Sequence, residues 1–203
     1  MKQIAIIIAV LAFSLSSYAS ANLLVNGDFE LTGEDGHLTG WTIDYNQNIA
    51  EAQDNPESGA WHARNYNDGG MYQDVSITGG MTYDITGYAY IPSGTGGSPW
   101  GTYIGVKFLR ANGTTATGGS FQVDMQGLPR DVYNLADTGW VVAPSDAVTA
   151  RVRFGTWSNA PYEPVAPTDF DNFSLVAVPE PTSLMLLGLG LFGIIGFAAK
   201  KKK

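Results

Sequence analysis

Residues 82–91 read TYDITGYAYI, and their strict alternation decides the fold class. The odd-numbered residues, from Tyr83 to Ile91, fall on one side of an extended chain, and the even-numbered residues, from Thr82 to Tyr90, fall on the other. The odd-numbered side is the more apolar of the two. The stretch therefore predicts a β-strand whose odd-numbered residues face a core.

Short alternating runs of the same kind recur between residues 22 and 177, separated by turn residues and without sustained helical periodicity. This pattern is typical of an all-β sandwich. Strands are expected at 23–25, 40–44, 60–65, 71–77, 83–91, 102–109, 121–124, 139–143, 149–155 and 169–176. In one of them, Val152 and Phe154 would point inward while Arg151, Arg153 and Gly155 face outward.

Turn residues predict how some of these strands connect. Both Thr78-Gly79-Gly80 and Ala111-Asn112-Gly113 are short enough to close a hairpin. Three segments are expected to be loops: residues 92–101, 112–120 and the Pro-rich 159–168.

The last residues, 178–203, read VPEPTSLMLLGLGLFGIIGFAAKKKK. The uncharged apolar run 182–199 has the length of a transmembrane helix. The lysines at 200–203 would stay on the cytoplasmic side by the positive-inside rule, so the preceding chain would lie outside the cytoplasm. A helix buried in a soluble core is the alternative, but the run has no polar face.

The first residues, 1–21, have the features of a secretory signal peptide. Lys2 supplies a positive start, residues 4–13 an apolar core, and residues 17–21 a small-residue cleavage region. Residues 22–177 then form one domain with six Lys and Arg against eighteen Asp and Glu, a net charge of −12. Such a charge argues against nucleic acid as a partner, and the absence of cysteine excludes thiol chemistry.

The tail resembles the PEP-CTERM sorting signal of Gram-negative, exopolysaccharide-producing bacteria, with Pro179, Glu180 and Pro181 as the matching residues. The resemblance implies processing by an exosortase, a membrane-embedded transpeptidase. It also implies export across the inner membrane and delivery to the cell surface or the extracellular matrix. A plain C-terminal membrane anchor is the alternative.

An ordered series of segments resembles the galactose-binding-like jelly roll of carbohydrate-binding modules. The segments are Asn22–Glu30, Gly40-Trp41, Met71–Gln73, Gly80–Tyr83, Gly139-Trp140, Ala143-Pro144 and Phe170–Leu175. The resemblance implies a jelly-roll β-sandwich with a function in binding polysaccharide.

That family often holds a structural calcium ion between its first and last strands, and calcium prefers carboxylate and carbonyl oxygens. The matching residues here are Asn26, Asp28, Glu30 and Asp171. The family's paired Asp-Asp is Asp171-Asn172 in this chain, which lowers the charge available to an ion. Acidic residues exposed at strand ends are the alternative.

Aromatic side chains in loops can stack on sugar rings. Trp100, Trp157 and Tyr162 are the predicted platforms, while Trp41 and Trp140 lie in strand patterns and are expected in the core. For Trp61 both interpretations stay open.

Catalysis is not expected, because the histidines are His37 and His62 and the sequence has no Gly-x-Ser-x-Gly elbow, no His-Glu-x-x-His motif and no phosphate-binding Gly loop. The sequence therefore predicts a non-catalytic exported protein that binds polysaccharide in a matrix or biofilm. A purely structural surface protein and, less favoured, a glycan hydrolase are the alternatives.

Overall fold

The computed structural model describes residues 21–33, 38–46, 49–93, 101–157 and 167–178. Every regular element among them is a strand, and residues Asn22–Val178 form one compact unit. Within these ranges no helix has the length and apolar character needed to cross a membrane. Three predicted features lie outside the described residues: residues 1–20 of the predicted signal peptide, the apolar span 182–199 and the lysines 200–203.

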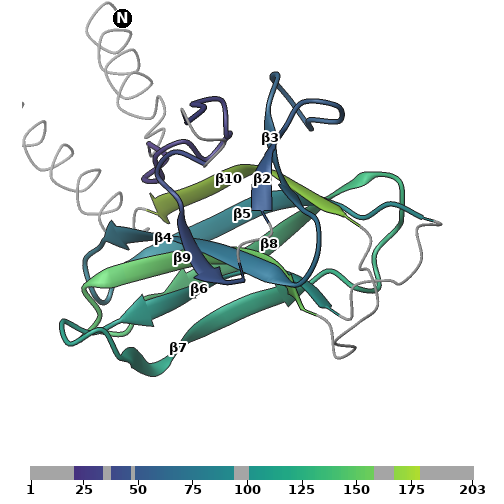
Figure 1. Cartoon of the computed structure of the whole chain (residues 1–203). Coiled ribbons are helices and arrows are strands. Elements are labelled where there is room, and N and C mark those ends of the chain that lie inside the picture. Colours follow the sequence, from purple (N-terminus) through teal and green to yellow (C-terminus); the bar gives the residue numbers. More distant parts are fainter. Residues whose placement is uncertain (1–20, 34–37, 47–48, 94–100, 158–166, 179–203) are drawn as a thin grey trace, which may run out of the picture. The chain divides into compact units, whose positions relative to one another are not determined.

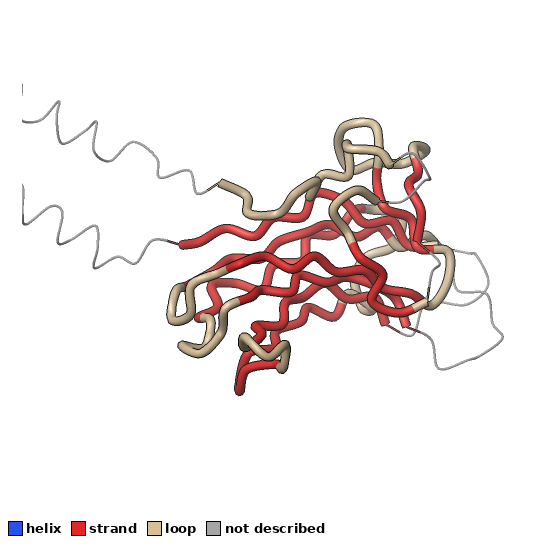
Figure 2. The backbone as a smooth tube through the Cα atoms, turned by 60° about the vertical axis from the view of Figure 1, so that its left-hand side comes forward, coloured by secondary structure: helices blue, strands red, loops and turns tan. Residues whose placement is uncertain are grey.

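The described strands form two five-stranded sheets, which lie one above the other (Figures 1 and 2). The first sheet has the order β1-β4-β9-β6-β7 and the second β2-β3-β10-β5-β8. The strands are β1 (Thr42–Tyr45), β2 (Ile49–Ala52), β3 (His62–Asn65), β4 (Gly69–Ser76), β5 (Thr82–Tyr90), β6 (Gly101–Leu109), β7 (Thr115–Asp124), β8 (Tyr133–Val142), β9 (Thr149–Trp157) and β10 (Thr168–Val178). All pairings between them are antiparallel.

The alternation in β5 is confirmed. Tyr83, Ile85, Ala89 and Ile91 are buried, and the even-numbered side chains are only partly covered. Apolar side chains from both sheets fill the space between them, because each sheet turns one face of alternating residues inward. The core includes Phe154 of β9, whose ring lies 4.7 Å from that of Phe170 and 4.9 Å from that of Phe173.

The hairpin at Ala111-Asn112-Gly113 is confirmed, since β6 and β7 pair on either side of it and Gly113 N donates to Arg110 O. The hairpin predicted at Thr78-Gly79-Gly80 is wrong, because β4 and β5 belong to different sheets. The turn crosses between the sheets instead. Gly79 packs there against the backbone of residues 144–147, and a Cβ at Gly79 would lie 2.5 Å from Ser145 O.

Two further expectations about strands are corrected. Residues 23–25 were expected to form a strand but are irregular, although Leu23 N donates a hydrogen bond to Leu175 O. Strand β2 was not expected from the sequence. Six of the nine residues of the expected loop 112–120 belong to β7. Gly118, at φ +71°, lies where the register between β6 and β7 shifts, so the Gly-rich sequence forms an irregular strand rather than a loop.

Trp41 is buried as predicted, but Trp140 is 70% exposed, so its assignment to the core is wrong. The cause is a β-bulge. Asp137 pairs with Thr86 and Trp140 with Asp84, so β8 has one more residue than β5 between these pairs. Gly139, at φ +66°, takes up the extra residue and turns Trp140 to the outer face of the sheet.

Candidate functional site

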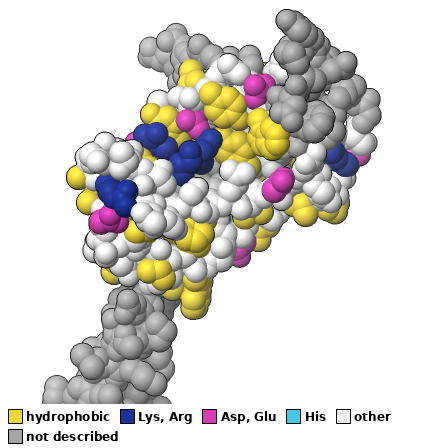
Figure 3. Space-filling view, turned by 90° about the horizontal axis from the view of Figure 1, so that it is seen from below, with side chains coloured by type: hydrophobic (Ala, Val, Ile, Leu, Met, Phe, Trp, Pro, Cys, Tyr) yellow, Lys and Arg dark blue, Asp and Glu magenta, His cyan; other side chains and the backbone are white. Residues whose placement is uncertain are grey.

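The outer face of the first sheet carries three cations of the acidic domain. Alternation along β6 and β9 turns Lys107, Arg151 and Arg153 to solvent, while Val152 and Phe154 face the core. Figure 3 shows Lys and Arg side chains gathered beside hydrophobic ones on the side of the domain that it displays. We call the part of the outer face of the first sheet that surrounds these three cations the cationic face. It comprises Asp44, Tyr45, Tyr72, Asp74, Tyr103, Lys107, Arg151, Arg153 and Trp157.

Arg153 is held from two sides. Its Nη2 lies 2.9 Å from Asp44 Oδ2 and donates to Tyr103 Oη at 2.8 Å. Its guanidinium carbon lies 4.8 Å from the centroid of the Tyr103 ring, close enough for a cation–π contact. Tyr103 is therefore almost fully buried although it belongs to an outward-facing position, and this burial raises the pKa of its phenol.

Arg151 forms a two-pronged ion pair with Asp74 on β4. Nε donates to Oδ1 and Nη2 to Oδ2, both at 2.8 Å, a geometry that suits the planar guanidinium. The hydrogen bond from Arg151 to Asp74 raises the pKa of the guanidinium further. The guanidinium carbon also lies 3.9 Å from the centroid of the Tyr72 ring, so this ring is covered by a cation.

Lys107 is the third cation, and it faces Arg151 directly across the β6–β9 ladder. No hydrogen bond or ion pair joins it to another described residue. Burial of the half-covered side chain, reinforced by Arg153, lowers the pKa of its ammonium group. Lys107 is therefore the group on this face that is free to bind a ligand.

Trp157 ends β9 at the edge of the same face and is 40% exposed. Its indole lies directly over Gly101 of β6, since a Cβ at Gly101 would come within 2.1 Å of Trp157 Nε1. Glycine at this position is thus required for the ring to lie against the strand. Trp157 has the exposure that a sugar platform needs, and its role stays a prediction; Trp100 and Tyr162 lie outside the described residues.

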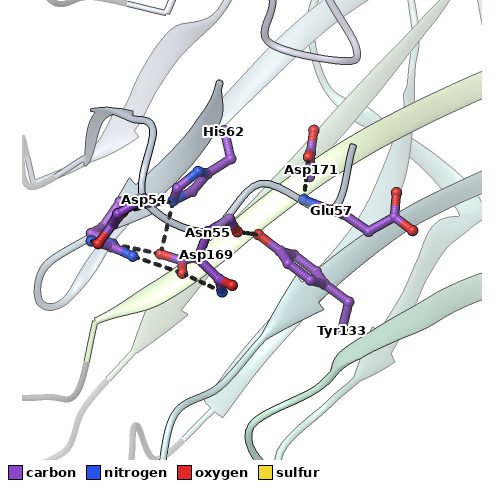
Figure 4. Close-up of polar contacts among 8 residues, drawn as sticks. Asp54, Asn55, Glu57, His62, Tyr133, Asp169 and Asp171 are labelled. Carbon is purple, nitrogen blue, oxygen red and sulfur yellow. Dashed lines mark hydrogen bonds and ion pairs between the residues drawn. The ribbon is translucent and has the colours of Figure 1, made fainter. Parts of the chain in front are cut away.

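A second polar cluster lies around β10 (Figure 4). Asp169 accepts hydrogen bonds from Arg64 Nε at 2.6 Å and Nη2 at 2.9 Å, and its Oδ1 lies 3.3 Å from His62 Nε2. Burial alone would raise the pKa of Asp169, but the hydrogen bonds from Arg64 and the nearby imidazole of His62 hold it below its ordinary value. His62 and Asp169 are buried, so this cluster stabilises the fold and faces no ligand.

Two of the predicted calcium residues, Glu30 and Asp171, hold the same segment, residues 57–61. Glu30 Oε1 accepts the backbone N–H groups of Ala60 and Trp61, and Asp171 Oδ2 accepts those of Glu57 and Ser58. Figure 4 shows Asp171 reaching this segment from β10. Burial raises the pKa of Asp171 to about 6, because its bonding partners are neutral N–H groups. A cation beside Asp171 would offset that effect, so these two residues fit a calcium ion in their chemistry.

The other two predicted calcium residues have different surroundings. The side chain of Asn26 is bonded to the backbone of Leu31 and Thr39, and the backbone carbonyl of Asn26 accepts a hydrogen bond from Trp41 Nε1. Asp28 lines a separate cavity with Asn26, Asn172 and neighbouring backbone. No group of three His, Cys, Asp or Glu close enough to hold a metal occurs in the described part of the chain.

The residues of the cationic face that sequence reasoning did not predict as site residues are Asp44, Tyr45, Tyr72, Asp74, Tyr103, Lys107, Arg151 and Arg153. The outward orientation of Arg151 and Arg153 was readable from the alternation in β9. Their neighbours were not, because Tyr72 and Lys107 are brought beside them by pairing between strands distant in sequence.

Comparison with known proteins supplies two findings. Residues 177–202 match the PEP-CTERM protein-sorting motif, which includes the predicted Pro179, Glu180 and Pro181. These three residues themselves lie outside the described part of the structure. A comparison with curated protein sequences finds no match.

Among solved structures, the domain is similar to several carbohydrate-binding modules. A family 16 module matches with a TM-score of 0.54 and 20% identity, over 76% of this chain and 99% of the module. The CBM22-1 xylan-binding domain of Paenibacillus barcinonensis Xyn10C matches with a TM-score of 0.54 and 16% identity, over 81% and 99%. A family 61 module solved with β-1,4-galactotriose matches with a TM-score of 0.52 and 15% identity, over 78% and 100%.

These similarities agree with the two five-stranded antiparallel sheets and confirm the expected architecture. At such low sequence identities these similarities establish the fold alone. The ligand has to be inferred from the residues of the site. The chain thus carries a PEP-CTERM sorting motif behind an all-β domain with the jelly-roll fold of carbohydrate-binding modules.

Proposed function

We propose that the protein is an exported, non-catalytic component of the cell surface or extracellular matrix that binds polysaccharide through its cationic face. The observation that carries this proposal is the exposed indole of Trp157 beside an array of outward-facing polar groups on one sheet of a jelly roll. An indole can stack on the C–H face of a sugar ring, and nearby charged groups can bond its hydroxyls. The xylan-binding and galactotriose-bound relatives support a glycan as the ligand class.

The destination proposed for the protein follows from the tail. The PEP-CTERM motif supports sorting to the surface by an exosortase, and we place the protein in a Gram-negative bacterium that secretes exopolysaccharide or forms a biofilm. Intact-mass measurement of the protein from its producer tests this. A mass that lacks residues 1–21 and the segment beyond Pro181 agrees with processing, and retention of the lysines at 200–203 contradicts it.

The absence of catalysis is part of the proposal. On the cationic face Asp44 and Asp74 are engaged by Arg153 and Arg151. A glycosidase needs one carboxyl group free to donate a proton and a second one to act as base or nucleophile. Release of reducing sugar from a bound polysaccharide would contradict this part of the proposal.

Calcium is proposed as a structural ion held with the help of Glu30 and Asp171. Both carboxylates hold residues 57–61, and Asp171 is buried without a cation of its own. Carboxylate oxygens are the ligands that calcium prefers. Asn26 and Asp28, whose groups are bonded elsewhere or line another cavity, are not part of this narrower proposal.

Native gel electrophoresis of the full chain, in gels that contain soluble polysaccharides, tests the binding function. Galactan, xylan, glucomannan, pectin and the producer's own polymer form the panel. We expect at least one of them to slow the protein, and Trp157→Ala to weaken this retardation about tenfold through loss of stacking.

Trp140→Ala is the matched control, because Trp140 is also exposed but lies on the outer face of the other sheet. It should leave the retardation unchanged. If no polysaccharide in the panel slows the wild-type protein, the binding function is wrong and a purely structural surface role is favoured. If Trp140→Ala abolishes binding and Trp157→Ala does not, the cationic face is not the binding surface.

A further inference from the structure

One of the three cations on the cationic face, Lys107, has no carboxylate partner among the described residues. The other two are paired, since Asp74 engages Arg151 and Asp44 engages Arg153. This unpaired lysine lies in a domain whose residues 22–177 carry a net charge of −12. An unpaired cation on an acidic protein offers a ligand of opposite charge a local site of attraction.

The arrangement of the strands holds the cations close together. Lys107 and Arg151 are directly opposite in the β6–β9 ladder, where like charges destabilise the pair. Gly105 lies between Tyr103 and Lys107 on the outer side of β6 and contributes no side chain there. Arg153 lies opposite Gly105, and burial, reinforced by the charge of Arg153, lowers the pKa of Lys107. An anion placed beside Lys107 would relieve this repulsion.

Two aromatic rings of the same face, those of Tyr72 and Tyr103, are not free to stack on a sugar. Arg151 covers the ring of Tyr72 at 3.9 Å, and Tyr103 is 3% exposed beneath Arg153. A ligand that crosses this face therefore meets guanidinium and ammonium groups, and the exposed ring of Trp157 lies only at its edge. These groups pair with carboxylates through charge-assisted hydrogen bonds, which are stronger than bonds to neutral hydroxyls.

We infer that the cationic face selects acidic polysaccharides, in which the carboxylates of uronic acid residues pair with Lys107 between Arg151 and Arg153. This inference rests on the proposed function and narrows it to a chemical class of ligand. Trp157 supplies the stacking contact to a neighbouring sugar ring, and Lys107 supplies the selection for charge.

Two polymers with the same backbone and different charge test the inference. Polygalacturonate carries a free carboxylate on each sugar, whereas highly methyl-esterified pectin has most of these groups blocked. The full chain is titrated with each polymer, and with alginate and neutral galactan, at low and at high NaCl concentration. We expect the acidic polymers to bind at least about tenfold more tightly than the esterified one, and binding to weaken with salt as charges are screened.

Variants of Lys107 locate the effect. Lys107→Met should weaken binding of the acidic polymers about tenfold and weaken binding of neutral galactan much less, while Lys107→Arg, which keeps the charge, should retain most of the affinity. Arg110→Met is the control for net charge. Arg110 pairs with Asp146 beside the β6–β7 turn, away from the cationic face, and its loss should not alter binding.

The outcomes separate this inference from the proposed function. Equal binding of esterified and acidic polymers, or an unchanged affinity of Lys107→Met, overturns selection for acidic sugars. If galactan or esterified pectin then binds in a manner that depends on Trp157, the proposed function stands. If none of the polymers binds the wild-type protein, the proposed function itself fails.

Discussion

Asp169 and Asp171 lie two residues apart on the same side of β10, yet their carboxyl groups have pKa shifts of opposite direction. Both are buried and both hold the segment that precedes β3. Arg64 supplies a positive charge to Asp169 and keeps its pKa low. Asp171 receives only neutral N–H donors, so burial raises its pKa to about 6.

The stability of the fold should depend on pH through the raised pKa of Asp171. A carboxyl group whose pKa is higher in the folded than in the unfolded state stabilises the fold below the unfolded value, near 4, and this contribution is lost as pH rises to about 6. The free energy of unfolding of the wild type relative to Asp171→Asn should therefore fall by about 2 kcal/mol between pH 4 and pH 6.5. Urea unfolding at a series of pH values measures this difference, and a difference that stays constant with pH would contradict the raised pKa.

Asp169 should behave in the opposite way at low pH. Its pKa is depressed in the folded state, so its contribution to stability is present above the unfolded value and is lost as pH falls through the folded value. Asp169→Ala leaves Arg64 partly buried without its main partner and should lower the free energy of unfolding by about 3 kcal/mol at pH 7. Asp146→Ala, which breaks the exposed pair with Arg110, is the control and should cost less than about 1 kcal/mol.

The bulge at Gly139 should be sensitive to substitution. Gly139 has φ +66°, and a Cβ there would meet no atom within 4 Å, so Gly139→Ala tests backbone strain without a steric clash. We expect a loss of about 1 kcal/mol, measured as a lower melting temperature. Gly127 also has open space around it but no positive φ, so Gly127→Ala should leave the melting temperature almost unchanged. Equal effects of the two substitutions would argue against strain at Gly139.

Calcium should raise the melting temperature of the full chain, and an excess of chelator should reverse the rise, because an ion that binds only the folded state stabilises it. Glu30→Gln and Asp171→Asn should abolish the shift. Asp28→Asn is the matched control and should retain it, since Asp28 lines a different cavity. A melting temperature that is the same with calcium and with chelator would exclude calcium as a structural ion.

Local patterns in the sequence were sufficient for the fold class and for much of the core. The alternation in 82–91 identified the buried side of β5, and the same period placed Val152 inward and Arg153 outward. These predictions succeed because the side chains of a strand alternate whatever its neighbours are. The Pro-Glu-Pro tail was equally readable, since a sorting motif is recognised as a linear sequence.

Strand pairing was not readable in this way. Thr78-Gly79-Gly80 has the composition of a hairpin turn but connects strands of different sheets, because the packing of Gly79 against residues 144–147 is a tertiary contact. The assignment of Trp140 to the core was wrong because one inserted residue, taken up at Gly139, reverses the alternation after it. Neither event changes the local composition enough to be detected.

The sequence by itself determined that the chain is an all-β domain with a sorting motif, because strand periodicity and a linear motif are local properties. Only the tertiary structure decided which side chains share a surface. Lys107, Arg151 and Tyr72 come from three different strands, and they form one face because β4, β9 and β6 are neighbours in the sheet. A binding face is a property of register between distant segments, which each segment alone does not encode.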